Sequence, residues 1–351
     1  MTQLASDIAI IGGGPVGLAT AIRARLAGLT VTLYEPKSGP IDKACGEGLM
    51  PSAIRHLAKL GVHPKRSHIF RGIRYINQGQ SATGHFWQGA GSGVRRLDLH
   101  KALTERLTEL GVEHRSTRAQ QITQQDNAVE VDGDQYRYVI AADGLNSPIR
   151  AKLELDLPPK RPKRLGLRQH FRQRPWSEYV EVYWSPYAEA YVTPVAEDEV
   201  GVAILFYKDH APKGQHKYQQ LLQHFPELLE RLDQSQPCST VRGAGPFERR
   251  VRTPLKGNIL LVGDSAGYLD PLTGEGIRLG LDTARSAVSA ICADSPRDHI
   301  KQCKQVTWRY WTLTSGLLFV RHRAWLRRRM VPTLRRWPTL FSRILEMLNN
   351  A

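Results

Sequence analysis

Residues 7–35 read DIAIIGGGPVGLATAIRARLAGLTVTLYE, and the fold can be worked out from this stretch. An apolar run short enough for a buried strand is followed by three spaced glycines. Apolar residues at helical spacing come next, and then a second apolar run that ends at Glu35. A strand, glycine turn, helix and strand within about thirty residues, with an acid at the end, form the context of a dinucleotide-binding fingerprint. The stretch therefore predicts a nucleotide-binding α/β unit.

The glycines of this stretch, Gly12, Gly14 and Gly17, form G-x-G-x-x-G. The first permits a tight turn, the second lets the backbone approach a pyrophosphate, and the third lets helix and strand pack closely. The helix that follows presents free N–H groups and its positive dipole end to the phosphates. Glu35 can accept a hydrogen bond from a ribose hydroxyl. All four residues are predicted to bind the cofactor.

Length and composition narrow the possible classes of protein. A chain of 351 residues allows about two domains. Its four cysteines are scattered without a C-x-x-C pair, which favours a reduced, cytoplasmic protein with neither a disulfide framework nor a metal site. No basic leader precedes the first apolar run, and no apolar run approaches the ~18 residues of a membrane span. We therefore expect neither a signal peptide nor a transmembrane helix.

A second motif lies further along the chain. An apolar run ends at Gly263-Asp264, and a loop containing Pro271 leads to Gly274 and Gly276 at the start of a long predicted helix. Asp264 can hold a second hydroxyl-bearing chain, and the glycines let backbone N–H groups lie against a planar ring. A helix N-terminus at that place favours the negative charge that a flavin gains on reduction. These features suit FAD better than NAD.

Together the motifs at 12–17, 142–144 and 263–277 resemble those of FAD-dependent oxidoreductases of the aromatic hydroxylase (p-hydroxybenzoate hydroxylase-like) superfamily. Residues 270–277, DPLTGEGI, are most similar to the geranylgeranyl reductase branch. The resemblance covers nearly the whole chain and implies one FAD per chain, bound non-covalently. It is much less specific for the substrate.

The resemblance also implies roles for residues outside the two glycine-rich stretches. Arg96 matches an R-x-x-[FL] motif whose arginine contacts the FAD pyrophosphate, and a guanidinium suits that dianion. Asp143 and Gly144 match a D-G motif linked to FAD and NAD(P)H. Residues 45–48, CGEG, take the place of a C-G-G-G stretch beside the flavin ring. The cofactor residues implied in this way are Cys45, Gly46, Arg96, Asp143, Gly144 and Ile277.

The motifs predict catalytic and substrate-binding residues less directly than cofactor-binding residues. Cys45 is either a proton donor or a small wall residue, and Glu47 is a candidate acid or base in the same loop. Residues 189–194, EAYVTP, correspond to Y-x-W-x-F-P of the reductases and W-x-W-x-I-P of the flavin halogenases. Only Tyr191 keeps an aromatic and only Pro194 keeps the proline, which argues against a halogenase. Both are expected to line the substrate pocket.

The order of the predicted elements indicates an interleaved α/β architecture. A Rossmann-like FAD-binding domain alternates along the chain with a β-sheet substrate domain, and a helical C-terminal tail follows. The predicted FAD-binding segments are 1–70, 95–157 and 250–295, the substrate segments are 71–94 and 158–249, and the tail is 296–351.

This architecture predicts an FAD-dependent oxidoreductase whose flavin accepts a hydride from NAD(P)H. No second fingerprint is present, so the nicotinamide is expected to bind transiently. We favour a monooxygenase that acts on a hydrophobic aromatic or polyene substrate. The alternatives are a geranylgeranyl reductase-like enzyme that reduces carbon–carbon double bonds, a quinone-linked dehydrogenase at a membrane surface, and a flavin-binding module without turnover.

The net charge of +16 has a local source near the C-terminus. Arginines between 321 and 343 alternate with tryptophans, leucines and a phenylalanine, so the tail is amphipathic. Two interpretations compete: the apolar residues pack on the FAD domain while the arginines face water, or the tail binds peripherally to an anionic inner-membrane surface. No nucleic-acid motif is present, so nucleic acid is not an expected partner. Pro332 and Pro338 predict two short helices rather than one.

Overall fold

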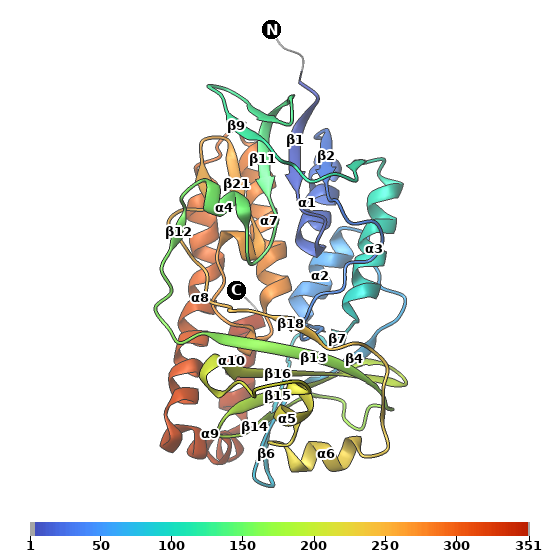
Figure 1. Cartoon of the computed structure of the whole chain (residues 1–351), viewed down its shortest axis with the longest axis vertical. Helices are drawn as coiled ribbons and strands as arrows, with labels where there is room; N and C mark the ends of the chain where they lie inside the picture. Colours follow the sequence, from blue (N-terminus) through green and yellow to red (C-terminus); the bar gives the residue numbers. More distant parts are fainter. Residues whose placement is uncertain (1–3, 350–351) are drawn as a thin grey trace.

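The computed structural model describes residues 4–349 and has two large sheets, one above the other in Figure 1. The upper sheet is mainly parallel and is flanked by helices. The lower sheet is mainly antiparallel, and the long helix α8 runs beside both (Figure 1). The mixed α/β fold with a helical C-terminal region is therefore the one that the sequence predicted.

The upper sheet has the strand order β20-β21-β11-β1-β2-β8, and β9 and β10 extend it beside β11. β1 pairs in parallel with both β2 and β11, and β11 pairs in parallel with β21. A strand with parallel neighbours on both sides is covered by helices on both faces, which explains its unbroken apolar run. The strands are β1 Ser6–Ile11, β2 Val31–Tyr34, β8 Glu113–Arg115, β9 Ile122–Gln124, β10 Val129–Val131, β11 Asp134–Ala141, β20 Leu255–Lys256 and β21 Ile259–Leu261.

The fingerprint glycines are required where helix α1 (Pro15–Leu26) leaves β1. Gly12 has φ +109°, and a Cβ atom there would lie 2.6 Å from the carbonyl oxygen of Ala142. A Cβ atom on Gly17 would lie 1.8 Å from the carbonyl oxygen of Gly12. Any side chain at either position would therefore push the helix away from the sheet.

The lower sheet has the order β17-β13-β16-β15-β14-β5-β6, and β18 pairs with β13. Helices α5 (Lys217–Leu222) and α6 (Pro226–Leu232) pack on one face, and the C-terminal helices pack on the other. The main strands are β5 Gly72–Asn77, β6 Gln80–His85, β13 Arg164–Arg172, β14 Val180–Trp184, β15 Ala188–Ala196 and β16 Glu199–Tyr207, with β17 Gln236–Pro237 and β18 Arg242–Ala244 at one edge.

Smaller elements join the two sheets. A three-stranded sheet of β3 (Gly48–Leu49), β7 (Gly91–Gly93) and β4 (His68–Phe70) carries the loop predicted to lie beside the flavin. β12 (Asp156–Leu157) pairs with β19 (Arg250–Val251) where the chain passes between the two halves. The remaining helices outside the tail are α2 Pro51–Lys59, α3 Arg96–Glu109, α4 Pro148–Lys152 and α7 Gly276–Cys292.

The C-terminal region consists of α8 (Asp298–His322), α9 (Ala324–Arg336) and α10 (Pro338–Asn349). The predicted pair of short helices is confirmed as α9 and α10, which are divided at Pro338. Pro332 was wrongly expected to interrupt the pattern, because that residue lies inside α9. Its neighbour Val331 is fully buried against the lower sheet, and this packing holds the helix through the proline. No helix within residues 4–349 combines the length and apolar character needed to cross a bilayer.

Candidate active site

The predicted cofactor motifs meet at one edge of the upper sheet. β1 ends at the fingerprint, β11 ends just before Asp143-Gly144, and β21 ends just before Gly263-Asp264. These three strands are neighbours and run in parallel, so their carboxyl ends lie together. In open α/β sheets this edge is where ligands bind.

Glu35 lies against the fingerprint turn. One carboxylate oxygen accepts a hydrogen bond from the Gly13 N–H (2.8 Å), and the other accepts one from the Lys37 N–H (3.0 Å). The side chain is half-buried. The acid at the end of β2 is therefore held next to the turn where an adenosine ribose would lie.

Two cationic side chains converge on the glycine turns. Nη2 of Arg96 lies 3.7 Å from the position of a Cβ atom on Gly14, and Nζ of Lys43 lies 3.9 Å from the corresponding position on Gly144. Burial lowers the pKa of Lys43, and the nearby Arg96 lowers it further. Nε of Arg96 is buried without a hydrogen-bond partner within residues 4–349. These unsatisfied positive groups fit a diphosphate.

The acids of the second and third motifs are also incompletely paired. The Asp264 carboxylate accepts no hydrogen bond from the described part of the chain, and burial raises its pKa against the opposing effect of Arg96. Oδ2 of Asp143 accepts from the Ile149 N–H (3.2 Å), whereas its Oδ1 is buried and unpartnered in that same part. Burial raises the pKa of Asp143 as well. We call this edge of the sheet, with Arg96, Lys43, Asp143 and Asp264, the groove. Hydroxyl donors of a ribityl chain or a ribose would satisfy its acceptors, so the groove fits FAD.

The loop before α7 is held by hydrogen bonds within the loop and from the lower sheet. Pro271 begins a short 3-10 turn, Gly274 is left-handed at φ +71°, and Gly276 is the first residue of α7. Asp270 caps the turn by accepting from the Leu272 N–H (3.1 Å), while the Tyr191 hydroxyl donates to the Leu272 carbonyl (2.9 Å). The half-buried Ile277 packs against the core of the upper domain. A planar ring could therefore lie against this loop without displacing it.

Strand β15 contacts both loops that are predicted to lie beside the flavin. Tyr191 reaches the loop before α7, and the Thr193 hydroxyl donates to the Gly46 carbonyl (2.8 Å). These two side chains alternate along the strand and share one face. Pro194 is three positions from Tyr191 and buried, with its carbonyl packed closely on Gly93. The structure therefore does not bring the two predicted pocket residues onto one face.

Cys45 and Glu47 differ in their surroundings. Sγ of Cys45 accepts from the Glu47 N–H (3.4 Å), and burial raises the pKa of the thiol, with Arg96 opposing the shift. The thiol is therefore protonated at neutral pH. Its proton makes no hydrogen bond to the described residues, so Cys45 keeps a proton that could be donated.

Glu47 is buried, and both of its carboxylate oxygens are engaged. Oε1 accepts a hydrogen bond from the backbone N–H of Arg96 (2.8 Å), and Oε2 lies 2.5 Å from Nε2 of His170. Nδ1 of His170 lies 3.1 Å from Nη1 of Arg168, which can only donate. Nδ1 therefore accepts and Nε2 donates to Glu47. This arrangement favours a brace between the flavin loop and β13 over a free acid or base.

Sequence reasoning missed the polar face of β13. Arg164, Arg168 and His170 alternate along the strand, a pattern normally assigned to solvent, yet all three are buried. Arg164 pairs with Asp270 (2.9 Å) and Glu189 (3.0 Å), and Arg168 pairs with Asp42. The available signal was the concentration of basic residues at alternate positions in a strand opposite the flavin loops.

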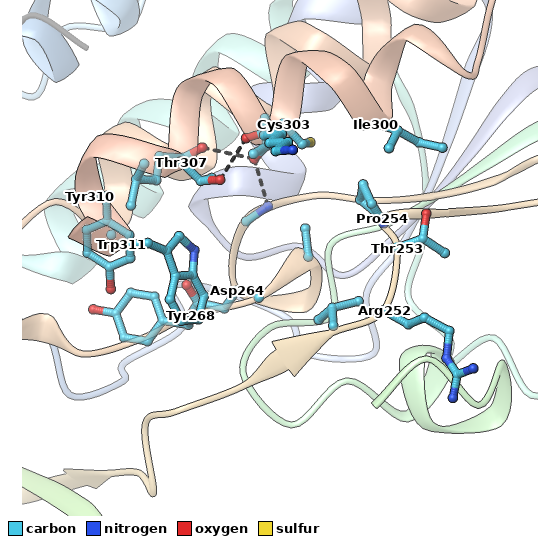
Figure 2. A pocket seen from close by; sticks show the side chains of 18 residues that line it. Arg252, Thr253, Pro254, Asp264, Tyr268, Ile300, Cys303, Thr307, Tyr310 and Trp311 are labelled. Carbon is cyan, nitrogen blue, oxygen red and sulfur yellow. Dashed lines mark hydrogen bonds between the residues drawn. The ribbon is translucent and has the colours of Figure 1, made fainter. Parts of the chain in front are cut away.

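A cavity of about 310 Å³ adjoins the second motif from the α8 side (Figure 2). Figure 2 shows Tyr268, Tyr310 and Trp311 together on one wall, near Asp264. The Tyr310 hydroxyl donates to the Asp270 carbonyl (2.8 Å), so α8 supports the flavin loop through this wall. The lining includes no residue of the loops at 12–17 and 45–48.

The chain is similar to known proteins over most of its length. A menaquinone reductase from Mycobacterium tuberculosis is 27% identical over 316 residues, which cover 82% of this chain and 76% of the relative. A digeranylgeranylglycerophospholipid reductase from Methanococcus vannielii is 26% identical over 323 residues, covering 82% and 77%. Both similarities extend well beyond the fingerprint.

A solved structure shares the fold. The p-nitrophenol 4-monooxygenase from Pseudomonas putida superposes with a TM-score of 0.82 at 20% identity, covering 99% of each chain. The resemblance to FAD-dependent hydroxylases and geranylgeranyl reductases that the motifs indicated is thus confirmed. The model of the FAD binding domain family matches residues 5–294. The chain therefore belongs to the FAD binding domain family and is an FAD-dependent oxidoreductase.

Proposed function

We propose that this oxidoreductase reduces carbon–carbon double bonds in a hydrophobic, isoprenoid-type substrate. The carrying observation is the half-buried Cys45 thiol, which is in the loop predicted to lie beside the flavin and whose proton has no hydrogen-bond acceptor among the described residues. The neighbouring acid, Glu47, is committed to His170 and Arg96. Cys45 is thus the group in this loop that retains a proton to give.

The reaction adds two hydrogens to an alkene. When bound and already reduced by NAD(P)H, the flavin would supply the hydride that goes to one alkene carbon. The other carbon must receive a proton, and Cys45 holds one at Sγ. Glu47 holds the loop in place, because its backbone N–H donates to Sγ of Cys45 and its carboxylate accepts from the backbone N–H of Arg96. These contacts position the thiol.

The surroundings of the two flavin loops support a hydrophobic substrate. Where the lower sheet meets the loop before α7, the buried side chains are aromatic and aliphatic: Tyr75, Trp184, Tyr268, Leu272 and Leu279. The buried acids nearby, Glu189 and Asp270, are paired with arginines. Digeranylgeranylglycerophospholipid, the substrate named for one relative, carries isoprenoid double bonds, which fits such surroundings.

We propose NAD(P)H as the source of the hydride. The sequence holds a single strand–turn–helix fingerprint, which the FAD would occupy, so the nicotinamide binds transiently. Rapid mixing of the FAD-loaded protein with NADH or NADPH under nitrogen tests this point. Bleaching of the flavin by either nucleotide supports the proposal, and an unchanged spectrum with both contradicts it.

The reaction itself is tested without oxygen. Chemically reduced, FAD-loaded protein is mixed anaerobically with a geranylgeranyl lipid, and flavin absorbance and product mass are followed. Double-bond reduction predicts that the flavin reoxidises and that the product gains two hydrogens per bond. If reoxidation instead requires oxygen and the product gains an oxygen atom, the enzyme is the monooxygenase that the sequence favoured.

A Cys45→Ala variant isolates the proton donor. Loss of a positioned general acid lowers the rate of a proton-transfer step by about 10²–10⁴-fold. We expect that loss in the reoxidation by alkene, with flavin reduction unchanged. The control is Cys292→Ala, because Cys292 is an exposed free cysteine at the end of α7. Equal rates for the two variants would make Cys45 a wall residue.

A further inference from the structure

Exposed apolar side chains are concentrated in the last fifty residues of the described chain. Thirteen large apolar side chains are exposed within residues 4–349, and seven of them lie in or between the C-terminal helices. Trp325 is 60% exposed and Trp337 is 59% exposed, at the two ends of α9. The seven are Ile300, Trp308, Phe319, Trp325, Trp337, Leu340 and Met347. Concentration of this kind marks an interaction surface.

The same helices carry more than half of the net positive charge of the chain. Between residues 299 and 345 the chain has eleven lysines and arginines and no aspartate or glutamate. Arg321 is buried and paired with Glu189, so it belongs to the interior. Four others on α9 are exposed and form no ion pair within the described residues: Arg328, Arg329, Arg335 and Arg336.

Helix α9 has two distinct faces. Val331 is fully buried and Met330 and Leu334 are half-buried, packing on the core beneath the lower sheet. The opposite face carries Trp325 and, one and three turns on, Arg329 and Arg336. Figure 1 shows α9 at the opposite end of the molecule from β9. The inner face anchors the helix, so the outer face is held rigidly toward the surroundings.

Aromatic and cationic groups are adjacent on this surface. The guanidinium of Arg323 lies 5.0 Å from the centre of the Phe319 ring, just before α9 begins. Side chains that pair an apolar ring with a positive charge suit the boundary between lipid headgroups and acyl chains. A polyanion such as nucleic acid would need the arginines but would leave exposed tryptophan and leucine side chains uncovered.

We propose that α9, with the adjoining ends of α8 and α10, binds an anionic lipid surface. Phe319, Trp325, Trp337 and Leu340 enter the headgroup region, and the exposed arginines pair with lipid phosphates. The inference goes beyond the proposed reaction, because it concerns where the enzyme works. The packing interpretation of the tail was wrong about the partner, because the inner face of α9 packs on the lower sheet and not on the FAD domain. The proposal adds that the outer face of α9 meets lipid.

Co-sedimentation with vesicles tests the proposal on the full-length, FAD-loaded protein. Vesicles of equal parts phosphatidylglycerol and phosphatidylcholine should bind it at low salt, and pure phosphatidylcholine should bind it far less. Binding should weaken as salt rises, because ions screen the arginines. Absence of binding to the anionic vesicles at low salt overturns the proposal.

Variants separate the charged and apolar contributions. Each basic residue near an anionic surface contributes about a fivefold change in binding, so Arg328→Gln with Arg329→Gln should cost about 25-fold. Trp325→Ala with Trp337→Ala should cost at least about tenfold, because two rings leave the lipid. The matched controls Arg118→Gln and Leu26→Ala change exposed residues of the upper domain and should bind as the unaltered protein does.

Three further outcomes test whether lipid binding belongs to this surface. All variants should keep their bound FAD, because none of these side chains touches the groove. If the tryptophan pair can be removed without loss, and duplex DNA competes at equal charge concentration with full effect, the surface is a general polyanion site and the proposal fails. If the control variants weaken binding as much as the α9 variants, the net charge rather than this surface is responsible, and the proposal fails as well.

Discussion

Two charged regions of the molecule are built on opposite principles. In the groove at the edge of the upper sheet, Nε of Arg96 and Oδ1 of Asp143 are buried without partners among the described residues. Beneath it, the buried cluster of Arg164, Glu189, Asp270 and Arg321 has a donor for every carboxylate oxygen, although Nη2 of Arg321 is buried without a partner among the described residues. Unpaired buried polar atoms cost free energy, so a fold keeps them where a ligand completes them. The groove is built for a cofactor, and the buried cluster holds the loops around it.

The largest predicted effect breaks the buried cluster. Glu189→Ala leaves Arg164 and Arg321 buried with too little negative charge, which should lower the free energy of unfolding by about 3–5 kcal/mol. Denaturant unfolding at saturating FAD measures this. The control is Glu178→Ala, which breaks an exposed pair with Arg71 and should cost no more than about 1 kcal/mol. Similar costs for the two variants would mean that the cluster is not a brace.

Glu275 resembles the buried cluster at one carboxylate oxygen, which is paired, and the groove at the other, which is not. Its Oε1 accepts from Arg278 (2.7 Å), while its Oε2 is buried without a described partner. Burial raises its pKa from 4.5 to about 7, with Arg278 opposing the shift. An acid whose pKa is raised by folding stabilises the fold below pH 4.5 and loses that contribution as pH rises through about 7.

The expected loss for Glu275 is about 3 kcal/mol across this range of pH. Unfolding curves between about pH 5 and 8 should therefore fall more steeply for the unaltered protein than for Glu275→Gln, with both saturated with FAD. Parallel curves would show that Glu275 is ionised and satisfied throughout, like the acids of the buried cluster.

The sequence predicted the groove better than the buried cluster, for a physical reason. Close approach of backbone to phosphate demands glycine, and this demand leaves a pattern at Gly12, Gly14 and Gly17 that can be read locally. The partners of Glu189 come from β13 and α8, 25 and 132 residues away. Nothing near Glu189 in the sequence distinguishes it from a solvent-facing strand residue.

The contrast within the groove is tested by its two acids. Asp264→Ala should weaken FAD binding by roughly 2–3 kcal/mol, since it removes a charged acceptor with no other partner. Glu35→Ala should cost about 1 kcal/mol, because its ribose contact lies nearer the surface. Fluorescence titration of FAD into the deflavinated variants compares them. Equal dissociation constants would contradict the placement of Asp264 beside the ribityl chain.

The smallest predicted effect concerns the contact between the lower sheet and the flavin loop. Thr193→Val removes the hydrogen bond to the Gly46 carbonyl and should cost about 1 kcal/mol of stability. The looser loop should also raise the quantum yield of the bound flavin, which steady-state fluorescence detects. Thr312→Val on the exposed face of α8 is the control. If the two variants have the same stability and the same flavin fluorescence, β15 does not support the flavin site.

Chain distance also explains why Thr193 and His170 escaped sequence reasoning. They contact the loop at 45–48 across 147 and 123 residues, and strand residues of these types are usually explained by propensity or solvent exposure. Pro332 shows the reverse case. A local rule predicted a helix break, and burial of Val331 next to it prevented the break.

The most direct test of the comparison is FAD uptake by the folded protein. We predict that denaturing the purified, reconstituted protein releases one FAD per chain, with none bound covalently. Arg96→Gln should weaken FAD binding by about 10- to 100-fold, because a charged contact to the diphosphate is lost, while Arg118→Gln binds as the unaltered protein does. A folded, soluble protein that takes up no FAD, or an Arg96→Gln variant with unchanged affinity, would contradict the assignment of the unpaired groove to the cofactor.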